Sequence, residues 1–161
     1  MKRFLTMLCA VVSTLGLPGC DYVAMKELKP GASTGYDVRD KLGTPTFEWR
    51  NEDGSLTWEF ARTPMGKENY MAEIGPDNVL RELRQVITEE NFARVRKGMS
   101  RDEIRHLLGK PASITPVPLK RQEAWEWRYA NPFNADMRFN VYFDPATGTV
   151  VRSETREEPK A

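Results

Sequence analysis

His106 is the single histidine of the chain and the first residue to consider for catalysis. A histidine acts as a general base only beside a positioned nucleophile or carboxylate. It lies next to Arg105 on a predicted helix, and the sequence names no such partner for it. Ser100, the best-placed serine, is the predicted N-cap of the same helix, so its oxygen is already used. We therefore expect a solvated surface histidine and no enzymatic activity.

The sequence also offers little for metals, cofactors or nucleic acids. The acidic pairs Glu89-Glu90 and Glu157-Glu158 fit a helix start and a charged tail better than a metal site, which needs several clustered ligands. No glycine-rich phosphate loop follows a strand. Without Lys2 and Arg3, the 24 Lys and Arg residues become 22, against 23 Asp and Glu. This near-neutral balance gives no electrostatic reason to expect nucleic acid.

The first 19 residues have the pattern of a signal peptide. Lys2 and Arg3 form a positive start, and the stretch from Phe4 to Leu17 is uncharged and mostly apolar. This stretch is too short to span a bilayer as a mature helix. Because Cys9 lies within it, the mature chain keeps Cys20 alone, and we expect no disulfide and no thiol catalyst.

The residues around Cys20 resemble the lipobox of bacterial lipoproteins. Leu17-Pro18-Gly19-Cys20 implies cleavage before the cysteine and a diacylglycerol on its thiol. Each buried methylene contributes about 0.8 kcal/mol, so two or three acyl chains would anchor the protein stably. Residues 20–29 would then be a lipidated tether. An ordinary cleaved signal with an unmodified cysteine is the alternative, and Asp21 resembles the signal that retains lipoproteins in the inner membrane.

The stretch Gly98–Pro111 is typical of one short helix with clear ends. Ser100 and Glu103 form a capping box, in which each side chain accepts a backbone N–H of the first turn. Gly109 supplies the turn that ends the helix, and Pro111 cannot continue it. The residues that share its apolar face are Ile104, Leu107 and Leu108.

The same signals occur 66 positions earlier in the chain. The matched residues are Thr34 for Ser100, Asp37 for Glu103, Val38 for Ile104, Arg39 for Arg105, Leu42 for Leu108, Gly43 for Gly109 and Pro45 for Pro111. Seven matches at one offset indicate an internal repeat. We therefore predict a first unit over 30–87, a second over 88–155 and a charged tail over 156–161.

Alternating apolar residues follow each of these helices and predict strands. The predicted strands are Thr46–Arg50, Leu56–Ala61, Tyr70–Ile74 and Val79–Ile87 in the first unit, then Glu123–Tyr129, Met137–Phe143 and Thr149–Thr155 in the second. The fold class is therefore α+β, with two tandem units. Each unit has one or two short helices packed on an antiparallel sheet of three to four strands, and the other sheet face is free to stay wet or to bind a partner.

The aromatic residues have two interpretations, core or interface. Trp127 and Tyr129 follow the repeat and are expected in the core. Trp49, Phe133 and Trp125 are the candidates for partner binding, because tryptophan and other aromatic residues are enriched among interface anchors.

The second helix and the strands after it resemble a known family. Gly98, Met99, Ser100, Ile104, Leu108, Gly109 and Pro111, followed by a Trp-x-Tyr strand at Trp127 and Tyr129, are similar to the SmpA/OmlA (BamE) lipoprotein domain. The match covers Thr88 to about Ser153 well, and 30–87 as a weaker copy. The tandem arrangement resembles the fold of the secreted β-lactamase inhibitor protein.

This resemblance implies a non-catalytic, lipid-anchored adaptor on the periplasmic face of the outer membrane. Its partner would be a protein, with the β-barrel assembly machinery as the candidate, and the lipid on Cys20 would provide its contact with the membrane. An inhibitor or ligand-binding module that uses an exposed sheet face is the alternative. An envelope hydrolase is a third hypothesis, which no catalytic constellation supports.

Overall fold

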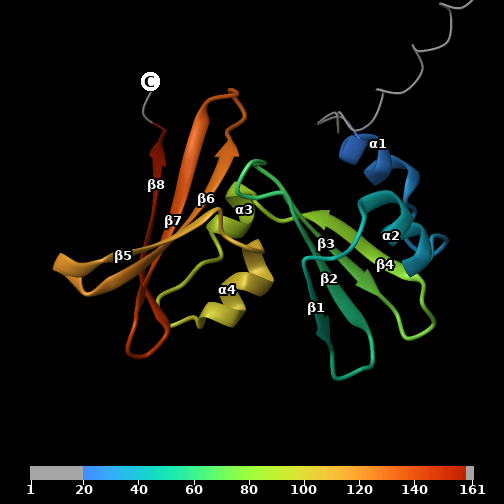
Figure 1. Cartoon of the computed structure of the whole chain (residues 1–161), viewed down its shortest axis with the longest axis horizontal. Helices are drawn as coiled ribbons and strands as arrows, with labels where there is room; N and C mark the ends of the chain where they lie inside the picture. Colours follow the sequence, from blue (N-terminus) through green and yellow to red (C-terminus); the bar gives the residue numbers. More distant parts are fainter. Residues whose placement is uncertain (1–19, 159–161) are drawn as a thin grey trace, which may run out of the picture.

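The structure, a computed structural model, describes residues 20–158. The predicted signal peptide over 1–19 and the last residues of the predicted tail lie outside this range. Within it, no helix is long and apolar enough to cross a bilayer. Figure 1 shows two sheets, each with its own pair of helices, placed one after the other along the long axis of the molecule.

The first unit contains two helices and four strands. The helices are α1 (Cys20–Glu27) and α2 (Gly35–Leu42), and the strands are β1 (Phe47–Arg50), β2 (Leu56–Ala61), β3 (Asn69–Ile74) and β4 (Leu80–Gln85). Neighbouring strands are antiparallel, and they lie in the order in which they occur along the chain. The stretch around β4 could equally have been helical by its apolar spacing, and the strand predicted from the repeat is confirmed.

The second unit repeats this order with longer strands. Its helices are α3 (Glu89–Phe92) and α4 (Arg101–Leu108), followed by β5 (Ser113–Val117), the short helix η1 (Pro118–Lys120), β6 (Gln122–Ala130), β7 (Asp136–Asp144) and β8 (Thr149–Glu157). These four strands also form an antiparallel meander in chain order. The predicted fold class, α+β with two tandem units, is thus confirmed.

Both predicted capping boxes are formed. Ser100 Oγ accepts the Glu103 N–H at 3.2 Å, and Glu103 Oε2 accepts the Ser100 N–H at 2.7 Å. Thr34 and Asp37 make the same pair of bonds at the start of α2, at 3.3 and 2.7 Å. The backbone N–H of the cap residue holds the pKa of each carboxyl group below its usual value. Both helix starts therefore carry the local signal that the sequence predicts, and each cap residue also bridges to a distant residue, Thr34 to Val79 and Ser100 to Thr149.

Three segments differ from the expectations. The tether expected over 20–29 is mostly helix α1, and it belongs to the first core, because Ala24 and Leu28 are buried there. Strand β5 precedes the three strands predicted for the second unit, and it accepts Pro116 because it lies at the edge of its sheet. Strand β8 continues to Glu157, two residues into the predicted tail.

Each unit has its own hydrophobic core between its helices and one face of its sheet. In the first core, Trp58 and Phe60 from β2 pack with Val38 and Leu42 from α2. In the second, Trp127 and Tyr129 from β6 pack with buried residues of α3 and α4. The prediction that Trp127 and Tyr129 are core residues is confirmed.

The other face of the first sheet packs against the second unit. Glu59 on β2 is fully buried, and its carboxylate accepts hydrogen bonds from the Arg105 side chain at 3.1 Å and from the Lys110 N–H at 2.6 Å. Asn69 on β3 donates to the Leu108 and Lys110 carbonyl oxygens at 3.1 and 2.9 Å. These contacts join the first sheet to the end of α4, which lies between the two sheets (Figure 1).

Candidate protein-binding surface

Trp125 is not available as an interface anchor. Its side chain is buried in the second core, and its Nε1–H donates to Glu123 Oε1 at 2.9 Å. It lies on the same face of β6 as Trp127 and Tyr129, and helices α3 and α4 cover that face. The prediction that Trp125 binds a partner therefore does not fit, because a partner would have to displace the core.

Trp49 also packs against another part of the protein, in a contact that the sequence does not predict. It is half-buried, and its ring lies 4.2 Å from the ring of His106 on α4. Arg105 lies over the neighbouring Phe47, 4.7 Å from the ring centre. Trp49 and Phe47 thus hold the two units together, and little of Trp49 is left for another protein.

Phe133 is the one predicted partner-binding residue that is open to solvent, with 90% of its surface exposed. It lies in the turn between β6 and β7, and the Asn131 side chain holds this turn by accepting the Phe133 and Ala135 N–H groups at 3.0 and 2.9 Å. A role for Phe133 in binding stays a prediction.

His106 is exposed on α4, in agreement with the predicted surface histidine. Its pKa lies below the usual value because burial disfavours the charged ring, although the nearby Asp102 carboxylate acts in the opposite direction. Its ring packs on Trp49, and the described residues 20–158 contain no group of three or more His, Cys, Asp and Glu residues that could hold a metal ion.

The structure leaves one sheet face uncovered within residues 20–158. The first sheet has α1 and α2 on one side and α4 on the other, while the second sheet has helices on one side only (Figure 1). We call its free side the outer face. The side chains that line it are Ser113, Thr115, Val117, Ala124, Glu126, Arg128, Arg138, Asn140, Tyr142, Arg152, Glu154 and Arg156, with Lys120 at the rim.

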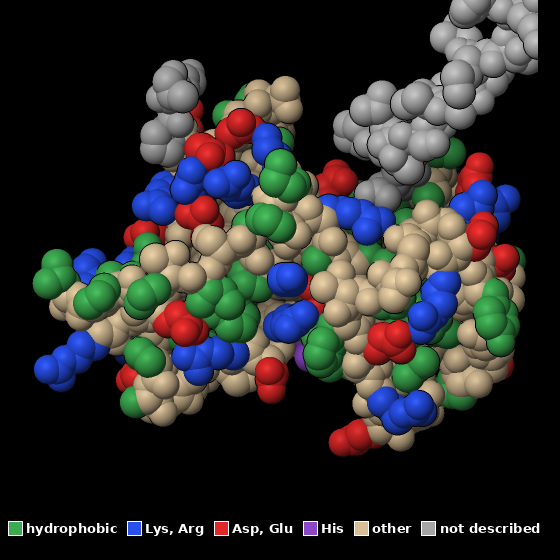
Figure 2. All heavy atoms as spheres, viewed as in Figure 1, with side chains coloured by type: hydrophobic (Ala, Val, Ile, Leu, Met, Phe, Trp, Pro, Cys, Tyr) green, Lys and Arg blue, Asp and Glu red, His purple; other side chains and the backbone are tan. Residues whose placement is uncertain are grey.

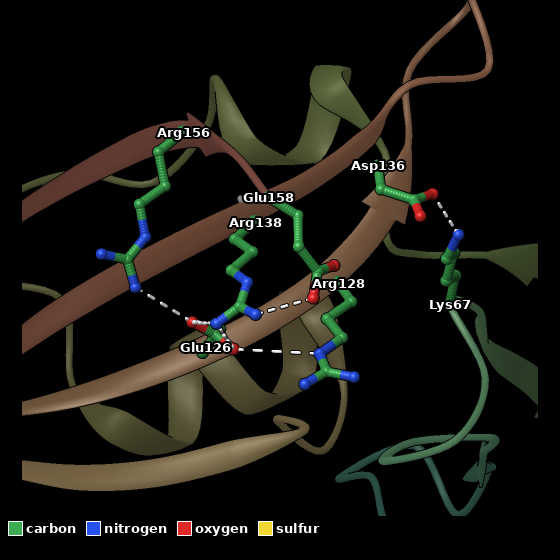
Figure 3. Close-up of polar contacts among 7 residues, drawn as sticks. All are labelled: Lys67, Glu126, Arg128, Asp136, Arg138, Arg156 and Glu158. Carbon is green, nitrogen blue, oxygen red and sulfur yellow. Dashed lines mark hydrogen bonds and ion pairs between the residues drawn. The ribbon is translucent and has the colours of Figure 1, made fainter. Parts of the chain in front are cut away.

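The outer face is concave, and these side chains enclose a hollow of about 590 Å³. Glu126, which is almost fully buried, lies at its centre. Its carboxylate contacts Arg138 and Arg156, both at 3.2 Å, and Arg128 at 4.0 Å (Figure 3). Glu158 contacts Arg138 from the opposite side at 2.6 Å. These four charged side chains of the strands and the side chain of Glu158 therefore form a single network.

A second cluster lies on the neighbouring part of the outer face. Arg152 stacks over Tyr142, 3.3 Å from the ring centre, and also contacts Glu154 at 2.7 Å. The Tyr142 hydroxyl donates to Glu154 at 2.6 Å, and this bond holds the pKa of Glu154 below its usual value. Burial raises the pKa of Tyr142. Figure 2 shows Lys, Arg, Asp and Glu side chains mixed at the end of the second sheet nearest the C-terminus.

The sequence contains only part of the signal for this surface. Glu126 and Arg128 alternate with the tryptophans of β6, which predicts a polar face. Which residues of β7 and β8 lie beside them depends on the strand register, and alternation within one strand does not give it.

The second unit matches a family of known role. Residues 85–153 match the model of the outer membrane protein assembly factor BamE domain. This range begins at the last residue of β4 and ends within β8, so it contains the helices and the sheet of the second unit. The predicted BamE-like resemblance is confirmed over these residues. A search of curated proteins gave no match.

Two solved structures resemble the chain at low identity. One is a crystal structure described as a candidate β-lactamase inhibitor protein from Streptococcus mutans, 12% identical over 84% of this chain and 94% of its own, with a TM-score of 0.35. The other is the DUF4309 family protein YjgB from Bacillus subtilis, 16% identical over 87% of this chain and 94% of its own, with a TM-score of 0.31.

Proposed function

We propose that this protein is a lipid-anchored periplasmic adaptor in outer membrane protein assembly, without catalytic activity. The observation that carries this proposal is the match of residues 85–153 to the BamE assembly-factor domain. The open and concave outer face of the second sheet supports a binding role.

The position of Cys20 supports the anchor. It is the first residue of α1, and the same helix places Ala24 in the first core. An α-helix rises about 1.5 Å per residue, so the eight residues of α1 span roughly 12 Å. A lipid on Cys20 would therefore hold the folded body close to the bilayer surface, on the outer membrane or, through the Asp21 signal, on the inner membrane.

Extraction in a mild detergent followed by purification of the tagged protein tests the adaptor role. Recovery of β-barrel assembly subunits is the expected result. The Cys20→Ser variant, added as soluble protein, is the matched control: it should still capture these subunits, because the proposed contact does not use the lipid. If the variant captures nothing, shared micelles explain the recovery and the adaptor role fails.

The lipid itself is tested by mass and fractionation. The wild-type chain should be membrane-bound and heavier than its cleaved polypeptide by the mass of its acyl groups. Cys20→Ser should be free of the membrane, and a membrane-bound variant with unshifted mass would contradict the anchor.

The alternative function is that of an inhibitor or ligand-binding module, and the open outer face is the observation that favours it. In this case the same purification would recover one soluble enzyme in place of assembly subunits. Inhibition of that enzyme in proportion to the protein added would replace the adaptor proposal.

A further inference from the structure

Three arginines lie side by side across the outer face. In the strand register, Arg128 on β6 pairs with Arg138 on β7, which pairs with Arg156 on β8. All three point to the side of the sheet away from the helices, where they line the hollow (Figure 3). We call these three residues the arginine row.

Such a row is unfavourable unless anions balance it, because like charges on directly opposite strand residues repel. Two carboxylates are in contact with the row. Glu126 is shared by all three arginines, and Glu158 contacts Arg138 alone. Three guanidinium groups against two carboxylates leave one positive charge on the row, and the nearby Arg152 and Glu154 balance each other. Lys120 at the rim of the hollow adds a further positive charge.

The groups without hydrogen-bond partners on this face are all donors. They are Arg128 Nε, Arg138 Nε and Asn140 Nδ2, and the Asn140 side chain is almost fully buried in the floor of the hollow. Buried donors without an acceptor are costly, so their presence together marks a place where an acceptor fits. The two outer arginines remain accessible, with 43% of the Arg128 side chain and 52% of the Arg156 side chain exposed.

We propose that the arginine row binds a carboxylate on an extended acidic segment of a protein partner. A carboxylate suits the row because its two oxygens match the paired N–H groups of a guanidinium, and its negative charge offsets the positive charge left on the row. Val117 and Ala124 provide apolar contacts for the neighbouring residues of such a segment. This inference deepens the proposed adaptor function, since it names the chemistry by which a partner is recognised.

A labelled peptide of alternating glutamate and threonine is a direct probe, with a peptide of glutamine and threonine as its control. Fluorescence anisotropy with the purified chain should show binding of the first peptide only, and this binding should weaken as salt is added. The double variant Arg128→Gln, Arg156→Gln should bind about tenfold more weakly, because it loses charge-assisted hydrogen bonds.

A matched variant, Arg50→Gln with Lys97→Gln, removes the same charge from exposed residues away from the outer face. It should bind as the wild type does. Both double variants should stay folded, because Arg138 still pairs with Glu126 in the Arg128→Gln, Arg156→Gln chain. An equal loss of binding in both would show attraction to net charge only and would overturn the inference.

Two further outcomes would also overturn it. One is equal binding of the glutamine peptide. The other is displacement of the acidic peptide by inorganic phosphate at millimolar concentration, which would indicate a phosphate site. Because this assay uses the purified chain alone, its failure leaves the detergent co-purification result unchanged, and the two proposals fail separately.

Discussion

The ion pair between Glu59 and Arg105 gives the sharpest prediction about how the two units are held together. Glu59 is completely buried, and its carboxylate pairs with Arg105, whose Nε and Nη2 both lie 3.1 Å from Oε2. Removing one partner of a buried pair leaves an uncompensated charge and costs about 3 to 5 kcal/mol. Arg105 is partly exposed, so we expect Arg105→Ala to lower the free energy of unfolding by about 3 kcal/mol, near the lower end of that range.

The internal repeat supplies a matched control. Arg39 occupies the position in the first unit that Arg105 occupies in the second, and it also stacks on an aromatic ring, that of Trp58, at 4.3 Å. Its ion pair is with Glu48, and both side chains are about two-fifths exposed. Exposed pairs contribute about 0 to 1 kcal/mol, so Arg39→Ala should have a small effect.

Urea unfolding followed by the fluorescence of the four tryptophans measures both variants. Adding Glu59→Gln to Arg105→Ala should restore about 1 to 2 kcal/mol, because it removes the unpaired charge and keeps an acceptor for the Lys110 N–H. If Arg105→Ala costs no more than Arg39→Ala, the buried pair does not hold the units together and this reasoning is refuted.

Two smaller predictions concern the helix cap and the histidine. Ser100→Ala should cost about 1 kcal/mol through the lost cap, and an unchanged urea midpoint would contradict the helix start. The pKa of His106 lies below the unfolded value of 6.5, so the unfolded chain binds its proton first as the pH falls. Stability should therefore fall below about pH 6.5, and His106→Gln should reduce that fall; an identical pH profile for the variant would contradict the packing of His106 on Trp49.

Much of the fold could be predicted because its signals are local. The capping boxes at Thr34 and Ser100 act within one helical turn, so seven matched residues sufficed to place two helices and a duplication. The alternation of residues along β6 also predicts that Trp125 is buried, because it shares a face of the strand with two core aromatic residues. The hypothesis that Trp125 binds a partner rested on its residue type, whereas its position in the strand places it in the core.

The contacts between the units could not be predicted in the same way. Gly43 and Gly109 occupy the same position in the repeat and both have positive φ, at +85° and +73°. A Cβ at Gly43 would meet nothing, while one at Gly109 would lie 2.8 Å from the Asn69 side chain of the other unit. Gly109 therefore ends α4 and also leaves room for the Asn69 side chain. Only the contact with Asn69 depends on how the two units are arranged.

This arrangement also leaves the second sheet as the one with a free face for the proposed partner, within residues 20–158. The first sheet uses one face for its own helices and the other for α4, through Glu59, Asn69 and Trp49. Figure 1 shows α1 within the first unit and α4 between the two sheets, so the outer face lies on the side of the second sheet away from α1. A partner can therefore reach the arginine row without displacing the helix that would hold the protein to its membrane.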